Sequence, residues 1–374
     1  MGRKLNDTWR GMDMKQRSIF TIGAAFMAVA FVFSGCAKPN ERLYLYNWNY
    51  YTPPSVIQKF EQEFGVRVVQ DEFDSNESMF AKLRSGGSGY DIVVPSADYV
   101  SIMIQLGMLE RIDHSKIKNL ANIDPVLLQK AVYDPRMEFS VPYYWGASGV
   151  AVNTARVPNF EESMSIFADP SLRERMTMLD DLREVLGFAL NYLGYSVNSS
   201  NPREIEAARD LINTQWKPNL VKFDADAFGK GFANEEFWVV QGYAETVFQE
   251  IAGNDQMMRN TRFFIPKEGG PAYIDSMVIP KGARNIELAH TFIDFIHRPE
   301  IYAEFCDTFG FPATANVPAR NFLRGPSWFA PNGVPRTEPW YTVEDLARTE
   351  LKEDVGEALV LFTTAWFDSI RIGK

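Results

Sequence analysis

The stretch that decides the fold is LYLYNWNYYTPPSVIQKFEQEFGVRVVQDEFDSNESMFAKLRSGGSGYDIVVPS, which spans residues 43–96. Alternating aliphatic and aromatic residues at 43–46 predict a β-strand that ends at Asn47-Trp48. Pro53-Pro54 then starts a helix whose apolar face lies within 56–64, and Gly65 stops this helix. The stretch therefore opens with a strand followed directly by a helix.

A second helix and two more strands complete this stretch. Residues 66–69 predict a strand, and either Ser75 or Asn76 caps the helix that follows it. The aliphatic run 92–94 predicts the third strand, which Pro95 breaks. Strands that alternate with helices in this way predict a parallel sheet with right-handed crossovers.

The rest of the 374-residue chain is long enough for a second compact unit of the same kind. We expect an α/β fold with two lobes, each a mostly parallel sheet flanked by helices, joined by hinge crossovers. In chain order the sequence predicts a Gly-punctuated crossing at 143–152, a strand at 176–179, a helix from 180 to 193, and a strand at 237–240. Residues 273–275 then lead into a return crossing at 276–280, which is followed by a helix at 286–296 and by surface turns at 332–338 and 350–354. The predicted first lobe is 41–147 with 275–316, and the second is 148–274 with 317–374.

The N-terminal segment is typical of an export signal. A basic start leads into an apolar run from Ile19 to Phe33, and Ser34-Gly35-Cys36 follows before the sequence turns polar. The run is short for a permanent membrane span. We expect residues 1–35 to be a lipoprotein signal peptide and Cys36 to be acylated, which would anchor a periplasmic protein to a bacterial membrane.

The charge balance of the remaining chain argues against nucleic acid as a partner. The first 35 residues carry five basic and two acidic side chains, which leaves 33 lysines and arginines against 46 aspartates and glutamates, a formal charge of −13. Nucleic-acid binding needs a basic surface, whereas an acidic surplus fits a cationic ligand. With Cys36 acylated, Cys306 is the only other cysteine, so no internal disulfide is expected.

Acidic and aromatic residues gather at the predicted strand ends and crossings. In an open parallel sheet these ends converge on one crevice, where ligands bind. Carboxylates hold the ammonium ends of an alkyl diamine or triamine, and flat aromatic rings hold its methylene spacers. The candidates are Trp48, Asn49, Tyr50, Tyr51, Ser96, Asp98, Asp181, Glu184, Tyr243, Glu245, Tyr273 and Asp275.

Each candidate also has a purely structural interpretation. Asp181 with Glu184 matches a capping box at a helix start. Asp98 could cap the helix after Pro95, and Asp275 could lie in a solvated turn. The aromatic residues Trp48 and Tyr51 could simply pack in the core.

Other chemistries find little support in the sequence. The histidines His114, His290 and His297 lack metal-ligand spacing, and the last two fit structural positions on one helix. Cys306 has no partner arrangement for nucleophilic catalysis, and no phosphate-cradling glycine loop is present. We therefore expect no cofactor, no metal and no enzymatic activity, with a carboxylate-pair hydrolase as the enzymatic alternative.

Several segments together resemble the spermidine/putrescine-binding proteins of ABC transporters, the PotD-like and PotF-like receptors. The resemblance covers roughly residues 41–374 and implies the two-lobed periplasmic-binding-protein fold. The segments are YNWNYYTPP (46–54), DSNESMFAKL (74–83), GYDIVVPS (89–96), PYYWGASG (142–149), LDDLREV (179–185), PREIEAA (202–208), FIPKEGG (264–270), YIDSMVIP (273–280) and FIDFIHRPE (292–300).

The resemblance implies roles for individual residues. Trp48 and Tyr51 would line the methylene chain, with Ser96 in the pocket, and Asp181 and Glu184 would anchor ammonium groups. The family's further positions correspond to Tyr273, which stands where the spermidine receptor has a tryptophan, the carboxylate Asp275 after it, Glu245, where putrescine receptors carry an acid, and Phe311, which replaces a tyrosine.

Two departures bear on ligand choice. Asp98 stands where the spermidine receptor has a tyrosine, and Tyr243 is the nearest substitute for a missing tryptophan. The choice between spermidine and putrescine stays open, although Asp181 favours spermidine.

The resemblance also implies partners. We expect a monomer that delivers its polyamine to an ABC permease and meets the membrane only through its lipid anchor. The alternatives are a protein of the same fold for another solute, such as an iron chelate or a sugar, and a polyamine sensor.

Overall fold

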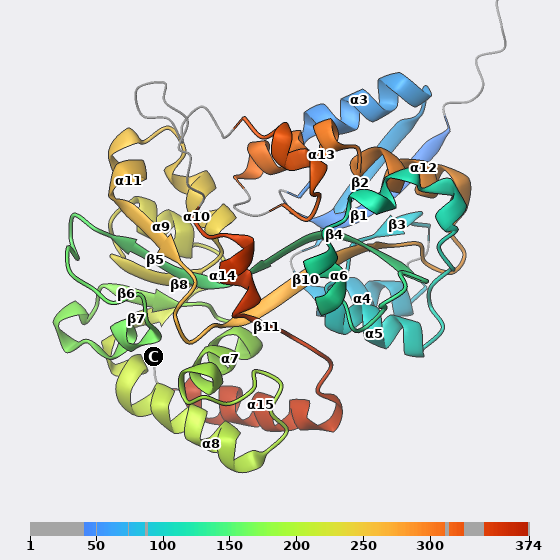
Figure 1. Ribbon diagram of the computed structural model, residues 1–374. Helices are drawn as coiled ribbons and strands as arrows, with labels where there is room; N and C mark the ends of the chain where they lie inside the picture. Colours follow the sequence, from blue (N-terminus) through green and yellow to red (C-terminus); the bar gives the residue numbers. More distant parts are fainter. Residues whose placement is uncertain are drawn as a thin grey trace, which may run out of the picture. The chain divides into compact units, whose positions relative to one another are not determined.

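A computed structural model describes residues 41–49, 51–73, 75–86, 89–310, 314–324 and 340–372. Two β-sheets flanked by helices make up this part of the chain (Figure 1). The strands are β1 (Arg42–Trp48), β2 (Arg67–Phe73), β3 (Ile92–Val93), β4 (Ser140–Ala147), β5 (Gly149–Asn153), β6 (Met176–Met178), β7 (Leu220–Phe223), β8 (Val239–Gly242), β9 (Thr261–Phe264), β10 (Pro271–Val278) and β11 (Glu350–Leu351). The α/β class expected from the sequence is confirmed.

The helices follow from local sequence signals. They are α3 (Pro54–Phe64), α4 (Asn76–Arg84), α5 (Ala97–Gln105), α6 (Pro125–Lys130), α7 (Leu182–Tyr192), α8 (Pro202–Leu211), α9 (Phe228–Ala233), α10 (Ala244–Ile251), α11 (Asp255–Asn260), α12 (Ile286–Ile296), α13 (Pro299–Phe309), α14 (Val343–Ala347) and α15 (Leu359–Ala365). Helix α3 ends at Gly65, whose positive φ of 66° costs a glycine nothing. Ser75 caps α4 by accepting a hydrogen bond from the Ser78 N–H, so the predicted stop of α3 and cap of α4 are confirmed. The suggested cap at Asp98 is wrong, because Asp98 lies within the first turn of α5.

The first sheet has the strand order β11-β10-β3-β1-β2, with β4 paired to β10. Strand β1 is parallel to β2 and to β3, as the sequence predicts. Strand β10 runs antiparallel to β3 and β4, and parallel to β11. The crossing strands thus add antiparallel pairs to a parallel core.

Successive side chains of β1 point to opposite faces of the sheet and therefore pack in two different hydrophobic cores. Leu43 and Leu45 pack with Phe60 of α3 and with residues of α12 and α13, whereas Tyr46 packs with Met79 of α4 and Met103 of α5. Helices therefore cover both faces of the first sheet. Burying a side chain as fully as Phe60 stabilises the fold by roughly 1.5–3 kcal/mol.

The second sheet has the strand order β7-β6-β8-β5-β9. Strand β6 is parallel to β7 and β8, and β5 is antiparallel to β8 and β9. Helices α7, α8 and α15 share one core with Val150 and Val152, while α9 and α10 share another with Ala151. Because neighbouring residues of β5 enter opposite cores, this sheet is also covered on both faces.

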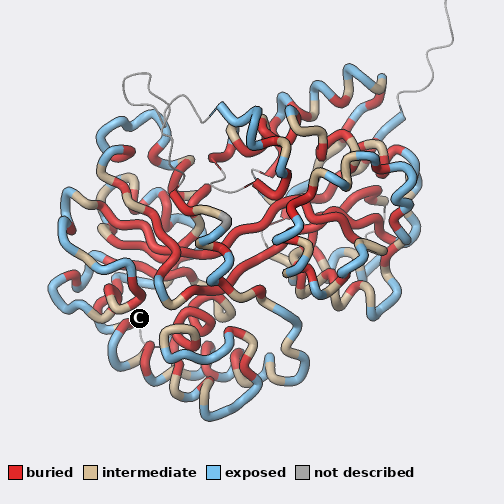
Figure 2. The backbone as a smooth tube through the Cα atoms, in the orientation of Figure 1, coloured by how far each residue is buried: buried red, intermediate tan, exposed pale blue. Residues whose placement is uncertain are grey.

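The buried strands β4 and β10 pair in the first sheet and connect it to the second. Strand β4 pairs with β10 in the first sheet, and β5 begins two residues later in the second. All residues of β4, β5 and β10 are buried, which Figure 2 shows as continuous red tube. The crossing predicted at 143–152 is this β4–β5 passage, and the return crossing falls on β10.

One prediction about the C-terminal region is wrong. Residues 350–354 were expected to form a surface turn, but Glu350 and Leu351 form β11, which pairs with Pro271 and Ala272 of β10. Leu351 is buried because it packs in the main core. The turn expected at 332–338 and the signal segment 1–35 with Cys36 lie outside the described residues. Within the described part of the chain, no helix combines the length and the apolarity that a membrane span requires.

Candidate functional site

Asp275 lies at the centre of the candidate site, on the crossing strand β10. The Tyr51 hydroxyl donates to its Oδ2 at 2.6 Å, and Ser96 Oγ donates to its Oδ1 at 2.6 Å. The strand register shifts between Asp275 and Ser276, and an isolated antiparallel bridge joins Ser96 to Asp275. Asp275 is only 4% exposed, so its interpretation as a solvated turn residue is wrong.

Tyr273 lies two residues before Asp275 on β10 and connects the site to a helix beside the second sheet. Its hydroxyl donates to Glu245 Oε1 at 2.9 Å, and Glu245 lies in the first turn of α10. On β4 the residue opposite Tyr273 is Gly146, where an added Cβ would lie 2.5 Å from the tyrosine hydroxyl oxygen. A glycine is therefore required for the Tyr273 ring to lie over the neighbouring strand.

Helix α7 supplies two further acids, which have different surroundings. Asp181 caps the helix, because its Oδ1 accepts from the N–H groups of Arg183 and Glu184. Glu184 is fully buried, and its side chain accepts from Ser148 Oγ at 2.6 Å and from the Tyr243 hydroxyl at 3.2 Å. The capping interpretation therefore holds for Asp181 alone, since the Glu184 carboxylate faces the site.

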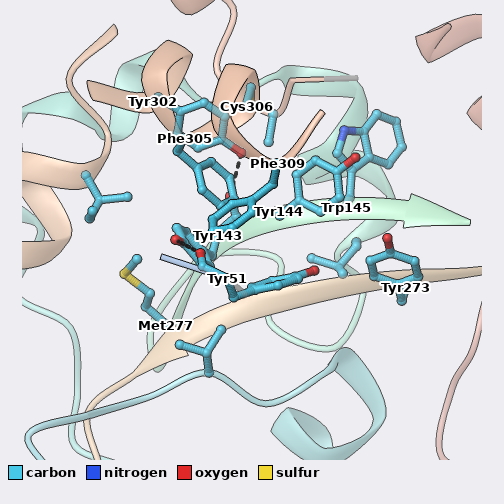
Figure 3. Close-up of a cluster of buried hydrophobic side chains, with 14 of the residues drawn as sticks. Tyr51, Tyr143, Tyr144, Trp145, Tyr273, Met277, Tyr302, Phe305, Cys306 and Phe309 are labelled. Carbon is cyan, nitrogen blue, oxygen red and sulfur yellow. Dashed lines mark hydrogen bonds between the residues drawn. The ribbon is translucent and has the colours of Figure 1, made fainter. Parts of the chain in front are cut away.

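Tyrosine rings connect these acids. The rings of Tyr243 and Tyr273 lie edge to face at 5.7 Å, and the rings of Tyr144 and Tyr273 lie 6.2 Å apart. Tyr51 meets Tyr144 edge to face at 6.3 Å. Figure 3 shows Tyr51, Tyr144 and Tyr273 beside the crossing strands, together with Tyr302, Phe305 and Phe309 of the aromatic core. Such rings offer flat faces to alkyl chains and to cations.

Burial raises the pKa of three acids in the site. Burial raises the pKa of Glu245 to about 7, against hydrogen bonds from its own backbone and from Tyr273. Burial likewise raises the pKa of Asp275 to about 6, against the hydrogen bonds from Ser96 and Tyr51. The pKa of Asp98 is raised by burial too, although Lys352 and Arg183 oppose the shift. A cation close to any of these acids would stabilise its ionised form and lower its pKa.

Two cations of the chain itself belong to the cluster. Lys352 Nζ donates to Glu184, and its ammonium also interacts with Asp98, Asp181 and Asp275. Burial acts to lower the pKa of Lys352, but the neighbouring acids outweigh it and the pKa lies above its usual value. Burial lowers the pKa of Arg183, against Asp98, Asp181 and Glu184.

The structure brings most of the predicted residues together. Direct hydrogen bonds join Tyr51, Ser96 and Asp275, then Tyr273 and Glu245, then Tyr243 and Glu184, and Asp98 and Asp181 interact with Lys352.

The other predicted residues are not part of these hydrogen bonds, or lie outside the described residues. Trp48 is half-buried, and it donates from Nε1 to the Val94 carbonyl at 2.9 Å. Its ring packs against Phe73. Asn49 is an exposed turn residue. Tyr50 and Phe311 lie outside the described residues.

Sequence reasoning missed Lys352, Arg183, Ser148 and Tyr144 as members of this cluster. Ser148 and Tyr144 fall in the predicted crossing, where their small or aromatic character fits a strand equally well. Lys352 was assigned to a surface turn, and no local pattern marks the strand before it. Only the pairing of β11 with β10 places Lys352 here.

The three histidines have structural contacts. His290 and His297 each hydrogen bond a backbone carbonyl four residues earlier, and His297 also reaches the Pro142 carbonyl. His114 reaches the Met137 carbonyl. The part of the chain that the structure describes contains no group of three or more metal-ligating side chains.

Comparisons with known proteins agree with the geometry. Residues 55–330 match the model of a family described as bacterial extracellular solute-binding protein. The spermidine/putrescine-binding periplasmic protein of Salmonella typhimurium is 33% identical over 363 residues, which cover 96% of this chain and 100% of the relative. The putrescine-binding periplasmic protein SpuD of Pseudomonas aeruginosa is 34% identical over 290 residues, 74% of this chain and 79% of the relative.

A solved structure is similar over nearly the whole described chain. The crystal structure of the TpPotD lipoprotein of Treponema pallidum aligns with a TM-score of 0.83 at 47% identity, and covers 89% of this chain and 100% of that one. This likeness confirms the two-lobed α/β fold and the family resemblance expected from the sequence.

Proposed function

The chain belongs to the bacterial extracellular solute-binding proteins, and on this basis we propose that it is an extracytoplasmic receptor for spermidine or putrescine that delivers its ligand to an ABC permease. Relatives named for these two polyamines align over most of their length. The family is one of solute-binding proteins and not of enzymes. The function is therefore reversible binding of a cationic solute.

The observation that carries the proposal is a buried cluster of acids among tyrosines. Glu245 and Asp275 are each less than a tenth exposed and have raised pKa values, so their ionised forms are only partly compensated in the free protein. A linear polycation supplies that compensation, and the rings of Tyr273 and Tyr51 fit its methylene segments. Ammonium–carboxylate hydrogen bonds contribute about 1.5–3 kcal/mol each, and micromolar affinity needs about 8 kcal/mol.

The test is calorimetric titration of the full-length chain, in mild detergent, with putrescine, spermidine and spermine. Butane-1,4-diol is the matched control ligand, because it keeps four methylenes and removes both charges. We expect micromolar or tighter binding of at least one polyamine and no heat with the diol, maltose or a ferric chelate. Binding of the sugar or the chelate instead, with no polyamine bound, would replace this proposal by the same fold serving another solute.

We also propose that residues 1–35 are removed, that Cys36 is acylated, and that the lipid anchors the protein in the periplasm. The basic start, short apolar run and Ser34-Gly35-Cys36 support this, and the similar Treponema pallidum protein is described as a lipoprotein. Mass spectrometry of the protein from membranes should show an acylated N-terminal cysteine. The Cys36→Ser variant should lose that modification and leave the membrane fraction.

The proposed lobes are 41–147 with 275–316, and 148–274 with 317–374. The acids of the site come from elements of both sheets, which supports closure of two lobes on a shared ligand. Asp98 lies on α5, while Glu184 and Glu245 lie on α7 and α10.

A further inference from the structure

Three arginines lie together at one edge of the first sheet, which we call the arginine edge. Arg42 and Arg67 are the first residues of β1 and β2, and they are register partners in this parallel pair. Arg284 lies beside them. Its N–H and that of Asn285 donate to Asp91 Oδ1, and the Asn285 side chain donates to the Arg42 carbonyl at 2.8 Å. In Figure 1 this edge lies on the right, away from the second sheet, and the candidate site lies at the opposite ends of β1 and β3.

The positive charge of the arginine edge is not neutralised by the fold. All three arginines are exposed, and none of them forms an ion pair with another described residue. The acids close by have other partners. Asp91 is fully buried, Glu61 accepts from a backbone N–H of β2, and Glu110 pairs with Lys281. Even with the exposed Glu41 before β1, the edge is a local positive region on an otherwise acidic protein.

Apolar surface borders the arginine edge. The loop that leads from β10 to Arg284 is held against the end of α5, because the Lys281 N–H donates to the Met108 carbonyl at 2.7 Å. Leu106, directly after α5, is 55% exposed. A hollow at this end of the helices is lined by Leu83, Gly89, Tyr90, Met108, Pro280 and Lys281. Basic groups next to exposed apolar surface are typical of segments that bind the headgroup region of a membrane.

The proposed lipid anchor is attached close to this edge. Arg42 is six residues after Cys36, and six fully extended residues span at most about 20 Å. Charge interactions in physiological salt decay over about 8 Å. Acylation of Cys36 would therefore keep the arginine edge within a few such lengths of the lipid headgroups. The acidic remainder of the protein is repelled by an anionic surface, which favours the orientation with the arginines toward the membrane.

We propose that the arginine edge binds the anionic phospholipid headgroups of the membrane that holds the lipid anchor. The inference goes beyond polyamine binding, and it rests on the proposed acylation of Cys36. The guanidinium groups donate to lipid phosphate oxygens, and Leu106 enters the headgroup region. In this orientation the carboxyl ends of β1 and β3 point away from the bilayer, so the candidate site faces the solution from which it takes its ligand.

The test uses the acylated protein, purified from membranes and inserted through its lipid into vesicles of phosphatidylcholine alone or mixed with phosphatidylglycerol. Phenylglyoxal modifies accessible arginines, and peptide mass spectrometry gives the rate at each one. We expect Arg42, Arg67 and Arg284 to react roughly fivefold more slowly on the anionic vesicles, and high salt to remove the difference. The exposed Arg203 and Arg259, beside the second sheet, should react at equal rates on both.

Lys281 reports on a variant that lacks the arginines. Its side chain is 57% exposed, and it lies on the same loop as Arg284. Acetylation of Lys281 should be slower on anionic than on neutral vesicles in wild type. The variant Arg42→Gln/Arg67→Gln/Arg284→Gln should lose this difference. It should still bind putrescine as wild type does, because none of the three arginines belongs to the candidate site.

The matched control is Arg173→Gln/Arg203→Gln/Arg259→Gln, which removes the same charge from exposed positions away from the edge. It should leave the slow acetylation of Lys281 on anionic vesicles unchanged. Thermal melts identify any variant that fails to fold, and the arginine rates in wild type test the inference without any substitution.

The outcomes separate this inference from the proposals beside it. Equal arginine rates on neutral and anionic vesicles overturn it, because the tether alone would then set the exposure of the edge. Slow acetylation that persists in the variant of the edge also overturns it, because another surface would then contact the lipid. An N-terminal cysteine without acyl groups removes the anchor and this inference together. Protection of the edge in a protein that binds no polyamine would remove the proposed ligand and leave the membrane contact standing.

Discussion

At the scale of single residues, Glu245 is a described acid that the chain compensates poorly. It is 8% exposed, and burial raises its pKa to about 7, while the adjacent Asp275 acts in the same direction. An acid whose pKa is raised in the folded state favours folding below its unfolded pKa and loses that contribution as the pH rises. The free protein therefore loses stability between about pH 4.3 and about pH 7, and a bound cation would restore it.

The ionisation of Glu245 predicts pH-dependent binding. At pH 6 a carboxyl group with a pKa near 7 is about nine-tenths protonated, and it must ionise to hold an ammonium group. We expect the protonation of Glu245 to weaken polyamine affinity about tenfold at pH 6 relative to pH 8, and its ionisation to release close to one proton on binding near pH 6, to which Asp275 adds about half a proton. Calorimetry in buffers of different ionisation enthalpy measures both quantities.

The matched variant for this pH dependence is Glu245→Gln, which cannot ionise. It should bind more weakly at pH 8 and release less than half as many protons near pH 6. Full proton release in this variant would assign the effect to another group, and Asp275, with a pKa of about 6, would be the next candidate.

The burial of Asp275 predicts that replacing this residue weakens ligand binding without lowering the stability of the free protein. Its raised pKa means that the ionised form is unfavourable in the free fold above pH 6. Asp275→Asn should therefore weaken spermidine and putrescine binding at least tenfold at pH 8, while the melting temperature of the free protein stays the same or rises. Titration and thermal melts of the same preparation give both numbers.

Asp134 is a control for Asp275, because it is also a buried aspartate but belongs to the fold alone. It is 6% exposed, and it accepts from the N–H groups of Glu138, Phe139 and Ser140. Asp134→Asn should lower the melting temperature and leave affinity within about twofold of wild type. The reverse pattern in the two variants would remove Asp275 from the site.

At the scale of elements, helix α7 combines a structural cap with a charge for the site. Asp181 accepts from two N–H groups at the start of the helix, and loss of such a cap costs about 1 kcal/mol. Asp181→Ala should therefore weaken binding and destabilise the free protein by about 1 kcal/mol. Asp181→Asn keeps a capping oxygen, so it should weaken binding with little effect on stability. Urea unfolding and titration of both variants separate the cap from the charge, and equal destabilisation by both would contradict this division.

The sequence predicts some elements well and others not at all, according to whether the element has a local sequence signal. The limits of α3 follow from Pro54 and Gly65, and α12 has the predicted bounds of 286–296, because caps, stops and apolar faces are local signals. Strand β11 has only two residues and exists through its pairing with β10. Its sequence carries no periodic signal, so Lys352 could not be placed in the site.

Asp275 shows the same limit in the candidate site itself. An aspartate is depleted in strands, and its sequence position alone favours an exposed turn. The hydroxyl groups of Tyr51 and Ser96, which are far away in the chain, hold it within β10. The sequence could predict that acids converge at the strand ends, but it could not predict which acids the protein already neutralises.

At the scale of the whole molecule, the distribution of the acids supports our proposal that ligand binding is coupled to lobe closure. Asp98 comes from α5 beside the first sheet, whereas Glu184 and Glu245 come from helices beside the second. In the free protein the remaining carboxylates repel one another, which disfavours a closed arrangement. A polycation reverses this, because it attracts acids from both lobes at once and so stabilises the closed form.

This coupling predicts a smaller radius of gyration in the presence of ligand. Small-angle X-ray scattering of the full-length chain should show the decrease on addition of saturating putrescine, and butane-1,4-diol at the same concentration should cause none. The Asp275→Asn variant should need at least tenfold more putrescine for the same decrease, because the closing energy comes from the charge contacts. A radius that is unchanged in wild type, at concentrations where calorimetry shows full occupancy, would mean that the ligand enters a preformed closed site, and the hinge proposal would then be wrong.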